Sequence, residues 1–139
     1  MSSILKMSGA ASLALHTAVI LAANPNKLIS TKDIASLLRA SEAHLSKVLQ
    51  QLEKTNIVTS IRGPKGGFRL AKPGDEITLL DVYESIEGRL SLNSCLLTEN
   101  ICDGRCIMGK MINDLNTRFK DYLSKTKLDD VSGFYKQLS

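Results

Sequence analysis

The sequence predicts a mainly α (α+β) fold in which several helices surround one short β-hairpin. Apolar residues recur with helical spacing on both sides of residues 57–70, whereas these residues form two β-prone runs around a glycine-rich turn. A long amphipathic stretch follows near the C-terminus. The chain has 139 residues, of which 43% are hydrophobic and 23% charged, so it can bury a core. We expect one domain, or one small domain with an appendage.

The first predicted helix contains the apolar stretch SLALHTAVILAA, residues 12–23. Its apolar positions can share one broad face, as a buried helix requires: Leu13, Val19, Ile20 and Ala23. The stretch also resembles the core of a signal peptide, but His16 interrupts it and only Lys6 supplies a basic start. No run reaches membrane-spanning length. We therefore expect a soluble, cytoplasmic protein with no membrane segment.

Two short helices with a tight connection come next. A hydroxyl followed by an acid, in Ser30 to Asp33, starts the first, and Ser41 caps the second, which runs to about Thr55. The apolar positions of the second helix follow the i, i+3, i+4, i+7 spacing: Leu45, Val48, Leu49 and Leu52. Polar residues fall largely on its other sides: His44, Ser46, Lys47, Gln50 and Gln51. This arrangement is typical of a helix-turn-helix.

The predicted hairpin follows directly, with β-prone residues 57–61 and 68–70 joined by the turn GPKGG. Its glycines permit positive φ and close approach, and its basic side chains offer contacts to phosphate or to a minor groove. The basic residues are Arg62, Lys65 and Arg69. An ordinary β-turn is the alternative. After a helix-turn-helix, however, a hairpin at this point predicts a winged helix-turn-helix.

The charge of the chain is unevenly distributed. Residues 1–72 contain ten Lys and Arg against three acids, whereas residues 73–139 contain eight against eleven. The first part therefore attracts polyanions and the second does not. Aromatic residues make up only 4% of the chain, which argues against a stacking surface for single strands. We therefore expect a DNA-binding winged helix-turn-helix region over residues 1–74.

Residues 75–139 are expected to form a sensor loop and dimerisation helices. A helix over 78–87 ends at Gly88, and a long helix runs from about Ile107 to Leu123. A capping box of Thr126 and Asp129 would start a last helix that reaches Leu138. The long helix has more apolar face than one small chain covers, so we expect a homodimer. A helix that folds back within one chain is the alternative.

Three cysteines lie between these helices, at Cys95, Cys102 and Cys106, and none occurs elsewhere. A structural disulfide is not expected in a reducing compartment, and the number is odd. Thiolates this close suit a soft metal or an iron–sulfur cluster. A zinc site, a redox thiol switch and cysteines without any ligand are the alternatives. An enzyme is not expected, because no C-x-x-C pair and no nucleophile–base motif is present.

The segment IRGPKGGFRLAKPGDEITLLDVYESIEG, residues 61–88, resembles the wing and following helix of the Rrf-two superfamily of IscR/NsrR/CymR-type bacterial regulators. That family has RGPxGG(Y/F)xLA in the wing, then P-x-x-I-T-L-x-D and a helix that ends in EG. Nearly the whole chain aligns, including Ile34 and Ala35 in the first helix of the pair. The resemblance implies a homodimeric transcription regulator, with repression as the expected effect, that binds a pseudo-palindromic operator in double-stranded DNA.

The resemblance also implies which residues meet DNA. Helix 41–56 would enter the major groove, and Arg62 would enter the minor groove with Lys65 and the amides of two glycines beside it. The expected DNA-binding residues are Thr31, Lys32, Ser41, Glu42, His44, Ser46, Lys47, Arg62, Lys65, Gly66, Gly67 and Arg69. For His44, a solvated helix position is an equal alternative. Well-studied members carry Glu and Gln where this chain has Ser46 and Lys47, so the operator sequence does not transfer.

Sensor members of the family hold an iron–sulfur cluster with three cysteines of this loop, which implies Cys95, Cys102 and Cys106 as ligands. The spacing C-x6-C-x3-C differs from that of the most familiar members. The fourth ligand is also different, because Gly109 replaces their histidine and the N-terminal helix has no acid. The candidates are Glu99, Asp103, His16 or an external small ligand. We expect a regulator that senses redox, iron or nitric oxide state. A cofactor-free thiol switch and a winged-helix protein-interaction module are the alternatives.

Overall fold

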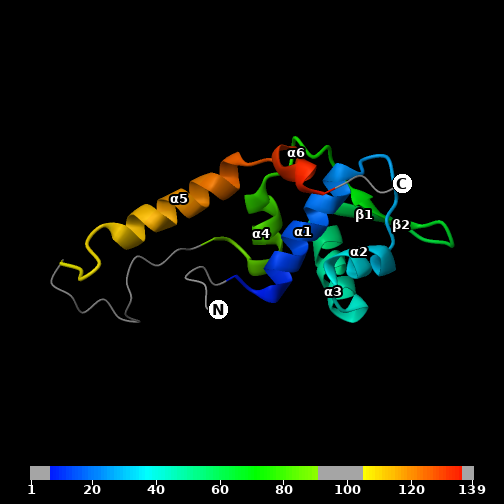
Figure 1. Ribbon diagram of the computed structural model, residues 1–139, viewed down its shortest axis with the longest axis horizontal. Coiled ribbons are helices and arrows are strands. Elements are labelled where there is room, and N and C mark those ends of the chain that lie inside the picture. Colours follow the sequence, from blue (N-terminus) through cyan, green and yellow to red (C-terminus); the bar gives the residue numbers. More distant parts are fainter. Residues whose placement is uncertain (1–6, 91–104, 136–139) are drawn as a thin grey trace.

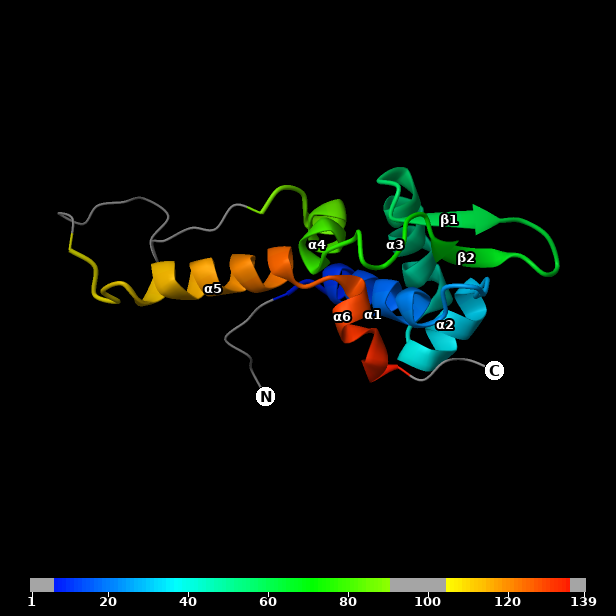
Figure 2. The same cartoon turned by 90° about the horizontal axis from the view of Figure 1, so that it is seen from above.

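The computed structural model describes residues 7–90 and 105–135. The central helix α1 lies between two projections, with the wing at one end of the molecule and α5 at the other (Figures 1 and 2). The helices are α1 (Gly9–Ala23), α2 (Thr31–Leu38), α3 (Glu42–Lys54), α4 (Leu79–Glu87), α5 (Met111–Lys125) and α6 (Leu128–Val131), followed by a 3-10 turn (Ser132–Phe134), and the strands are β1 (Val58–Ile61) and β2 (Gly67–Leu70). The predicted mainly α winged helix-turn-helix fold is confirmed.

Helix α1 is the centre of the core. Its N-cap is Ser8, whose hydroxyl oxygen accepts the Ala11 amide at 3.0 Å. From Thr17 to Ala23 every residue is buried, because α3, α4, α6 and β2 cover it from different sides. The predicted single apolar face was therefore too narrow for the second half of this helix. In the part of the chain that the structure describes, no helix is long and apolar enough to cross a membrane.

The helix-turn-helix forms as predicted, but the sequence did not indicate the left-handed residue in its turn. Ser30 caps α2 and accepts the Asp33 amide at 3.1 Å, and Ser41 caps α3. Between the two helices, Arg39 takes the left-handed conformation with φ 53°, and the Ala40 amide donates to the Ala35 carbonyl at 2.9 Å. A glycine usually occupies such a position. Arginine here exposes a long cationic side chain at the turn.

The wing is a two-stranded antiparallel hairpin in which Val58 lies opposite Leu70 and Ile61 opposite Gly67. A third segment pairs with it, because Ile29 forms an isolated antiparallel bridge with Phe68. A Cβ at Gly67 would lie 2.8 Å from the Ile29 carbonyl oxygen, so only glycine allows this approach. The wing is therefore attached to the segment that precedes α2.

Helix α4 starts with a capping box, in which Thr78 and Asp81 each accept the other's backbone amide at 3.0 Å. Just before it, the chain pairs with the start of α6: the Leu79 amide donates to the Thr126 carbonyl at 3.0 Å, and the Leu128 amide donates to the Ile77 carbonyl at 2.9 Å. The start of α4 and the chain just after α5 are therefore held side by side, although the cysteine segment separates the two helices in the sequence.

Two predicted helix bounds in this part were wrong. Residues 107–110 form turns, and the long helix begins at Met111. The last helix is short, and its N-cap is Lys127, one residue later than the predicted cap; the Lys127 amide donates to the Asp130 carboxylate at 2.8 Å. Thr126 is not the cap, because its carbonyl accepts the Leu79 amide rather than an amide of the helix. Leu138 lies outside the described residues.

The core contains residues from both predicted regions. Ile77, Leu79, Val82, Leu123 and Leu128 from the second region pack with the buried residues of α1, α2 and α3. Helix α5 contributes only its last turns, since Leu123 is its one residue in this core among those described, with Phe119 packed against it. The rest of α5 extends away from the body (Figure 1).

Candidate nucleic-acid interface

The solvent-facing side of α3 is polar. Glu42, His44 and Lys47 are exposed and Ser46 is half-buried, whereas the predicted apolar positions of this helix are buried in the core. Ser41 is exposed as well, but its hydroxyl oxygen accepts the His44 amide at 3.2 Å. Its oxygen is therefore partly used by the cap, while its hydroxyl proton remains available to an acceptor.

The first turn of α2 carries Thr31, which is half-buried, and Lys32, which is exposed. Asp33 in the same turn complements the helix dipole, and its amide is used by the Ser30 cap. Lys32 is therefore the group in this turn that can reach an anion freely, because a long side chain keeps its ammonium in solvent.

The basic residues of the wing all point into solvent. Arg62, Lys65 and Arg69 are exposed, the first two in the loop and Arg69 on β2 opposite Thr59. In the loop, Gly63 has φ 118° and its carbonyl accepts the Gly66 amide at 3.0 Å. The Gly66 amide, which we expected to be available to DNA, is therefore used inside the turn. The role that the geometry gives Gly66 is to shape the loop.

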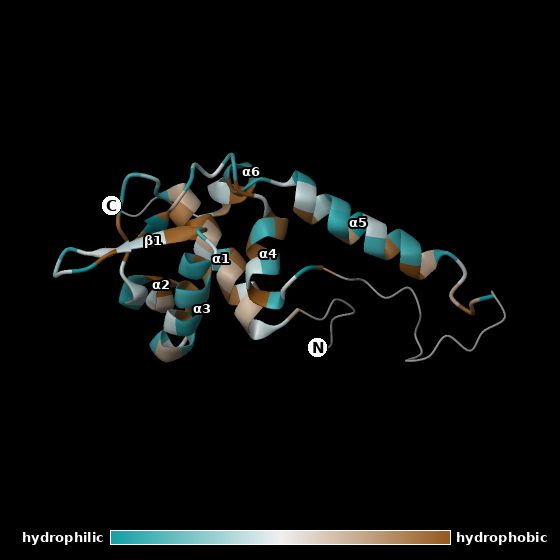
Figure 3. Cartoon of the chain, turned by 180° about the vertical axis from the view of Figure 1, so that it is seen from behind, coloured by the Kyte–Doolittle hydropathy of each residue, from teal (hydrophilic) through white to brown (hydrophobic). Residues whose placement is uncertain are grey.

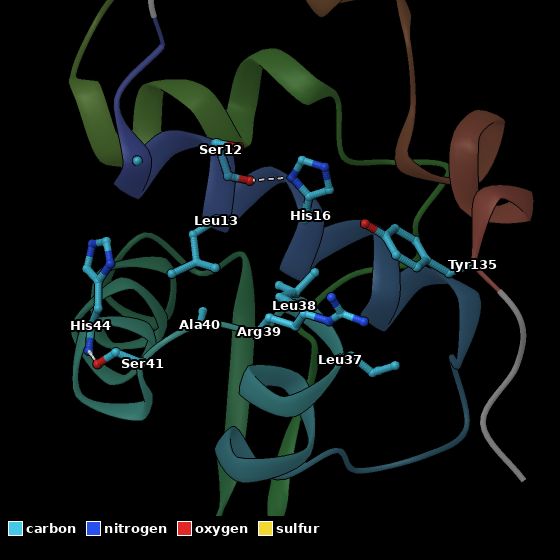
Figure 4. Close-up of a pocket in the computed structure, with 11 residues that line it drawn as sticks. Ser12, Leu13, His16, Leu37, Leu38, Arg39, Ala40, Ser41, His44 and Tyr135 are labelled. Carbon is cyan, nitrogen blue, oxygen red and sulfur yellow. Dashed lines mark hydrogen bonds between the residues drawn. The ribbon is translucent and has the colours of Figure 1, made fainter. Parts of the chain in front are cut away.

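A groove of about 560 Å³ lies between α1 and the turn of the helix-turn-helix (Figure 4). Leu13 and Leu38 lie in its middle, and none of its lining residues is acidic. The polar residues that border it are Ser12, His16, Arg39, Ser41, His44 and Tyr135. Two expected DNA-binding residues, Ser41 and His44, thus border one groove with Arg39. No pattern in the sequence pointed to Arg39, because its exposure here follows from a left-handed turn.

His16 belongs to the body of the protein. Its Nδ1 lies 2.7 Å from the Ser12 carbonyl oxygen, so Nδ1 carries the proton, because a carbonyl only accepts. Its ring meets Tyr135 edge to face, with centroids 6.4 Å apart. The N-terminal end of α5 lies far from α1 in both views (Figures 1 and 2). His16 is therefore not placed to share a ligand with Cys106 of the same chain.

Of the three cysteines, only Cys106 lies within the described residues, while Cys95 and Cys102 lie outside them, as do Glu99 and Asp103. Cys106 is exposed shortly before α5, and its sulfur accepts the Met108 amide at 3.4 Å. Over residues 7–90 and 105–135, no three His, Cys, Asp or Glu lie close enough to hold a metal ion. A cysteine sulfur is the type of ligand that holds iron–sulfur clusters in proteins.

The fold, the exposed polar face of α3 and the basic wing define a winged-helix transcription regulator that binds DNA, and not an enzyme. Residues 7–133 match the Rrf2 family, described as iron-dependent transcriptional regulator. The chain belongs to the Rrf2 family.

Known proteins resemble the chain over most of its length. A relative from Aquifex aeolicus is 32% identical over 122 residues, which are 85% of each chain. The transcriptional regulator NsrR of Bacillus licheniformis is 30% identical over 131 residues, 91% of this chain and 92% of NsrR. The structure of CymR, the global cysteine regulator of B. subtilis, has a TM-score of 0.80 at 27% identity and covers 96% of this chain and 100% of CymR.

Proposed function

We propose that this regulator is a homodimer that binds a pseudo-palindromic operator, and that a cysteine-bound iron–sulfur cluster alters its DNA affinity. The observation that carries the DNA-binding part is that an exposed polar helix, α3, and an exposed basic hairpin belong to one packed body. In this proposal residues 1–74 read DNA and residues 75–139 sense and dimerise. The two regions differ in function but are not separate structural domains, since residues of both pack in one core.

The proposed contacts divide into base edges and phosphates. Ser41, Glu42, His44 and Ser46 lie on the exposed side of α3 or at its start, where a recognition helix meets the major groove. Contacts to the phosphate backbone of DNA fix the register of the protein on the duplex. In this proposal they come from Lys47, Thr31, Lys32, Lys65 and Arg69. Arg62, at the start of the wing loop, enters the minor groove. Gly66 and Gly67 give the wing the shape that brings it to DNA, since a Cβ at Gly66 would meet the Ile61 carbonyl and one at Gly67 the backbone of Ile29.

The homodimer rests on the uncovered apolar residues of α5 and the turn before it. Met108, Met111, Leu115 and Tyr122 are 40% to 58% exposed, and Ile107 is 93% exposed. Figure 3 shows apolar patches along α5, away from the body of the protein. A second copy of α5 covers such a face in an isologous interface and doubles the buried apolar area. The two reading heads would then meet two half-sites.

The proposed ligands of the cluster are Cys95, Cys102 and Cys106. Cys106 lies where the chain turns into α5, and its sulfur accepts a hydrogen bond from the Met108 amide. When bound, such a cluster supplies a centre whose charge depends on its redox state. The fourth ligand stays open between Glu99, Asp103, a group of the partner chain and an external ligand, because the N-terminal end of α5, which Cys106 precedes, lies far from α1 (Figure 2).

A change at the cysteine segment would reach DNA through the two helices that flank it. The segment joins α4, which packs on α3, to α5, which we propose as the dimer helix. Ordering or releasing the segment would therefore change the separation of the two reading heads. This is a coupling between two sites, and it holds only if both states of the segment differ in DNA affinity.

The test is an absorption spectrum with iron and sulfide analysis on protein purified without oxygen, for the wild type, Cys106→Ser and Ser124→Ala. We expect broad visible absorption in the wild type and Ser124→Ala, and its loss in Cys106→Ser. DNA affinity measured on the same samples should change with the cluster in the wild type and Ser124→Ala but not in Cys106→Ser. Wild-type protein that is colourless, iron-free and cannot be reconstituted would contradict the cluster and leave DNA binding intact.

A second candidate is a thiol switch without a cofactor, which the exposure of Cys106 favours. An accessible thiol can be oxidised reversibly where a buried one is inert. In this case mild oxidation of the iron-free protein changes DNA affinity, and Cys106→Ser removes the response. An unchanged affinity after oxidation would rule this candidate out.

A further inference from the structure

The last turn of α3 is joined to α4 by a small group of polar side chains. Gln51 Nε2 donates to the Ser85 carbonyl oxygen at 3.0 Å, and the Thr55 and Ser85 hydroxyl oxygens lie 2.6 Å apart. Thr55 is the C-cap of α3, and Ser85 lies in the second half of α4. We call Gln51, Thr55 and Ser85 the α3–α4 clamp.

The direction of the hydrogen bonds in the clamp follows from its acceptors. The Thr55 hydroxyl lies 3.3 Å from the Gln51 carbonyl oxygen and 3.2 Å from that of Leu52. A carbonyl only accepts, so the Thr55 proton points back into α3. The Thr55 oxygen then accepts the proton of Ser85. Each helix donates once to the other, which defines one relative position of the two.

The rest of the contact between α3 and α4 is apolar. Val48 and Leu52 from α3 and Val82 from α4 are buried in the core, and Ser85 is only 8% exposed. Apolar side chains attract without strong directional preference, so they tolerate small rotations of one helix against another. Thr55 is exposed and its bond to Ser85 is part-buried, but a hydrogen bond still depends on direction and distance, which an apolar contact does not. The clamp therefore fixes the angle that the apolar contact leaves adjustable.

Helix α4 is itself held close to the clamp. The Glu87 carboxylate accepts the hydroxyl of Ser8, which is the N-cap of α1. The Glu84 carboxylate accepts the Leu90 amide at 2.6 Å, on the segment that leads towards the cysteines. These two bonds flank Ser85 in the sequence. The clamp thus ties α3 to an element that is anchored to the central helix.

We propose that Thr55 and Ser85 are positioning residues for DNA recognition, which set the angle at which α3 presents its N-terminal half. This rests on the proposed role of α3 as the reading helix. The clamp holds the end of α3 opposite to Ser41. Over a helix about 20 Å long, a tilt of about 5° at the clamp moves the other end by nearly 2 Å, by helix geometry. Such a shift breaks hydrogen bonds to base edges and spares contacts to phosphates, which tolerate looser geometry.

The experiment compares Thr55→Val, which removes the hydroxyl but keeps the shape, with Thr55→Ser, which keeps the hydroxyl. Binding is measured to the duplex that the wild-type protein selects from a random-sequence library, and to a scrambled duplex of the same composition. We expect Thr55→Val to weaken binding to the selected duplex roughly tenfold and to the scrambled duplex less than about twofold. Thr55→Ser should stay within about twofold of the wild type on both.

A merely structural role predicts a different result. Loss of folded protein lowers the active fraction for both duplexes alike and leaves the ratio of the two dissociation constants unchanged. Folded Thr55→Val with a wild-type ratio would therefore overturn the proposal. If this variant does not fold, Gln51→Met and Ser85→Ala test the same clamp from its other two members, with the same expected loss of discrimination.

The proposed role of α3 and of the wing is tested separately by Lys47→Ala and Arg62→Ala. If these two variants bind the selected duplex as the wild type does, the assigned reading surface is wrong. If they weaken binding and all clamp variants keep the wild-type ratio, only the positioning proposal fails. A double variant, Thr55→Val with Ser85→Ala, should discriminate between the two duplexes no worse than either single variant, because both substitutions remove the same Thr55–Ser85 hydrogen bond.

Discussion

Ile29 and Phe68 exchange two backbone hydrogen bonds, with N···O distances of 3.0 Å and 2.8 Å. The pair joins the segment that leads into α2 to the second strand of the wing. Two strands alone are marginal in water, and this third segment adds both backbone pairing and a connection to the core. The wing and the helix-turn-helix are consequently parts of one body, and their relative position is defined before DNA is bound.

The substitution Gly67→Ala should open this pairing. Its new Cβ would lie 2.8 Å from the carbonyl carbon and oxygen of Ile29, so the two backbones must separate. We expect a loss of about 1–3 kcal/mol in the free energy of unfolding, measured by urea denaturation, and weaker DNA binding. Gly133→Ala is the matched control, because nothing lies within 4 Å of its added Cβ. Equal stabilities of the two variants would show that the approach of Ile29 is not close in solution.

Arg62→Ala should weaken binding to the selected duplex about tenfold, since one strong contact in each protomer is lost. The slope of the logarithm of affinity against the logarithm of salt concentration should fall by about one for each protomer if the contact involves phosphate. Lys125→Ala is the control, because Lys125 is also an exposed cation and lies in the last turn of α5, far from the wing. Equal effects of the two substitutions would contradict the assignment of the wing.

Leu115→Asp should separate the proposed dimer. Leu115 is 49% exposed on the apolar face of α5, and a carboxylate there would have to be desolvated in the interface. Sedimentation or light scattering should then report a monomer at concentrations where the wild type is a dimer. Thr117→Asp introduces the same charge at an exposed position two residues further on, which faces another side of the helix. A dimer that persists in the Leu115→Asp variant would exclude this face as the interface.

Stability should fall at high pH because of Tyr83. Burial raises the pKa of Tyr83 above its ordinary value of 10.0, and the Glu87 carboxylate raises it further. A raised pKa in the folded state contributes stability below about pH 10, which is lost as the pH rises through the folded-state value. Tyr83→Phe keeps the ring that meets Phe119 edge to face and removes the titration.

Urea denaturation between about pH 8 and pH 11 measures this effect, and the difference between variant and wild type isolates it from other groups. Tyr135 should contribute in the same direction, because burial also raises its pKa. Tyr122→Phe, at a ring that is 58% exposed, is the control for the loss of a hydroxyl. An identical pH dependence of Tyr83→Phe and the wild type would contradict the prediction.

The elements that the sequence predicted well are those with local signals. The hydroxyl caps at Ser30, Ser41 and Thr78 start helices as expected, and each accepts an amide three residues further on. The glycine-rich turn of the wing was recognised because positive φ at Gly63 has a direct residue preference. The winged fold and the exposed residues of α3 followed from these short-range rules.

The features that were missed depend on contacts between distant segments. Gln51 was expected on a solvent face, but it donates to Ser85 on α4. Ile29 shows no strand pattern, because a single bridge needs none, and Arg39 adopts a conformation that its side chain does not favour. The start of α6 shifted because Thr126 gives its carbonyl to Leu79. None of these pairings leaves a periodicity in the sequence.

The backbone pairing of Ile77 and Leu79 with Leu128 and Thr126 fastens the two ends of a long excursion of the chain. Once its ends are fixed, the entropy of closing such an excursion grows only with the logarithm of its length. Insertions or deletions between α4 and α5 therefore cost the body of the protein little. The number of residues between the cysteines can therefore change without loss of the contacts that hold the helix-turn-helix and the wing in the body.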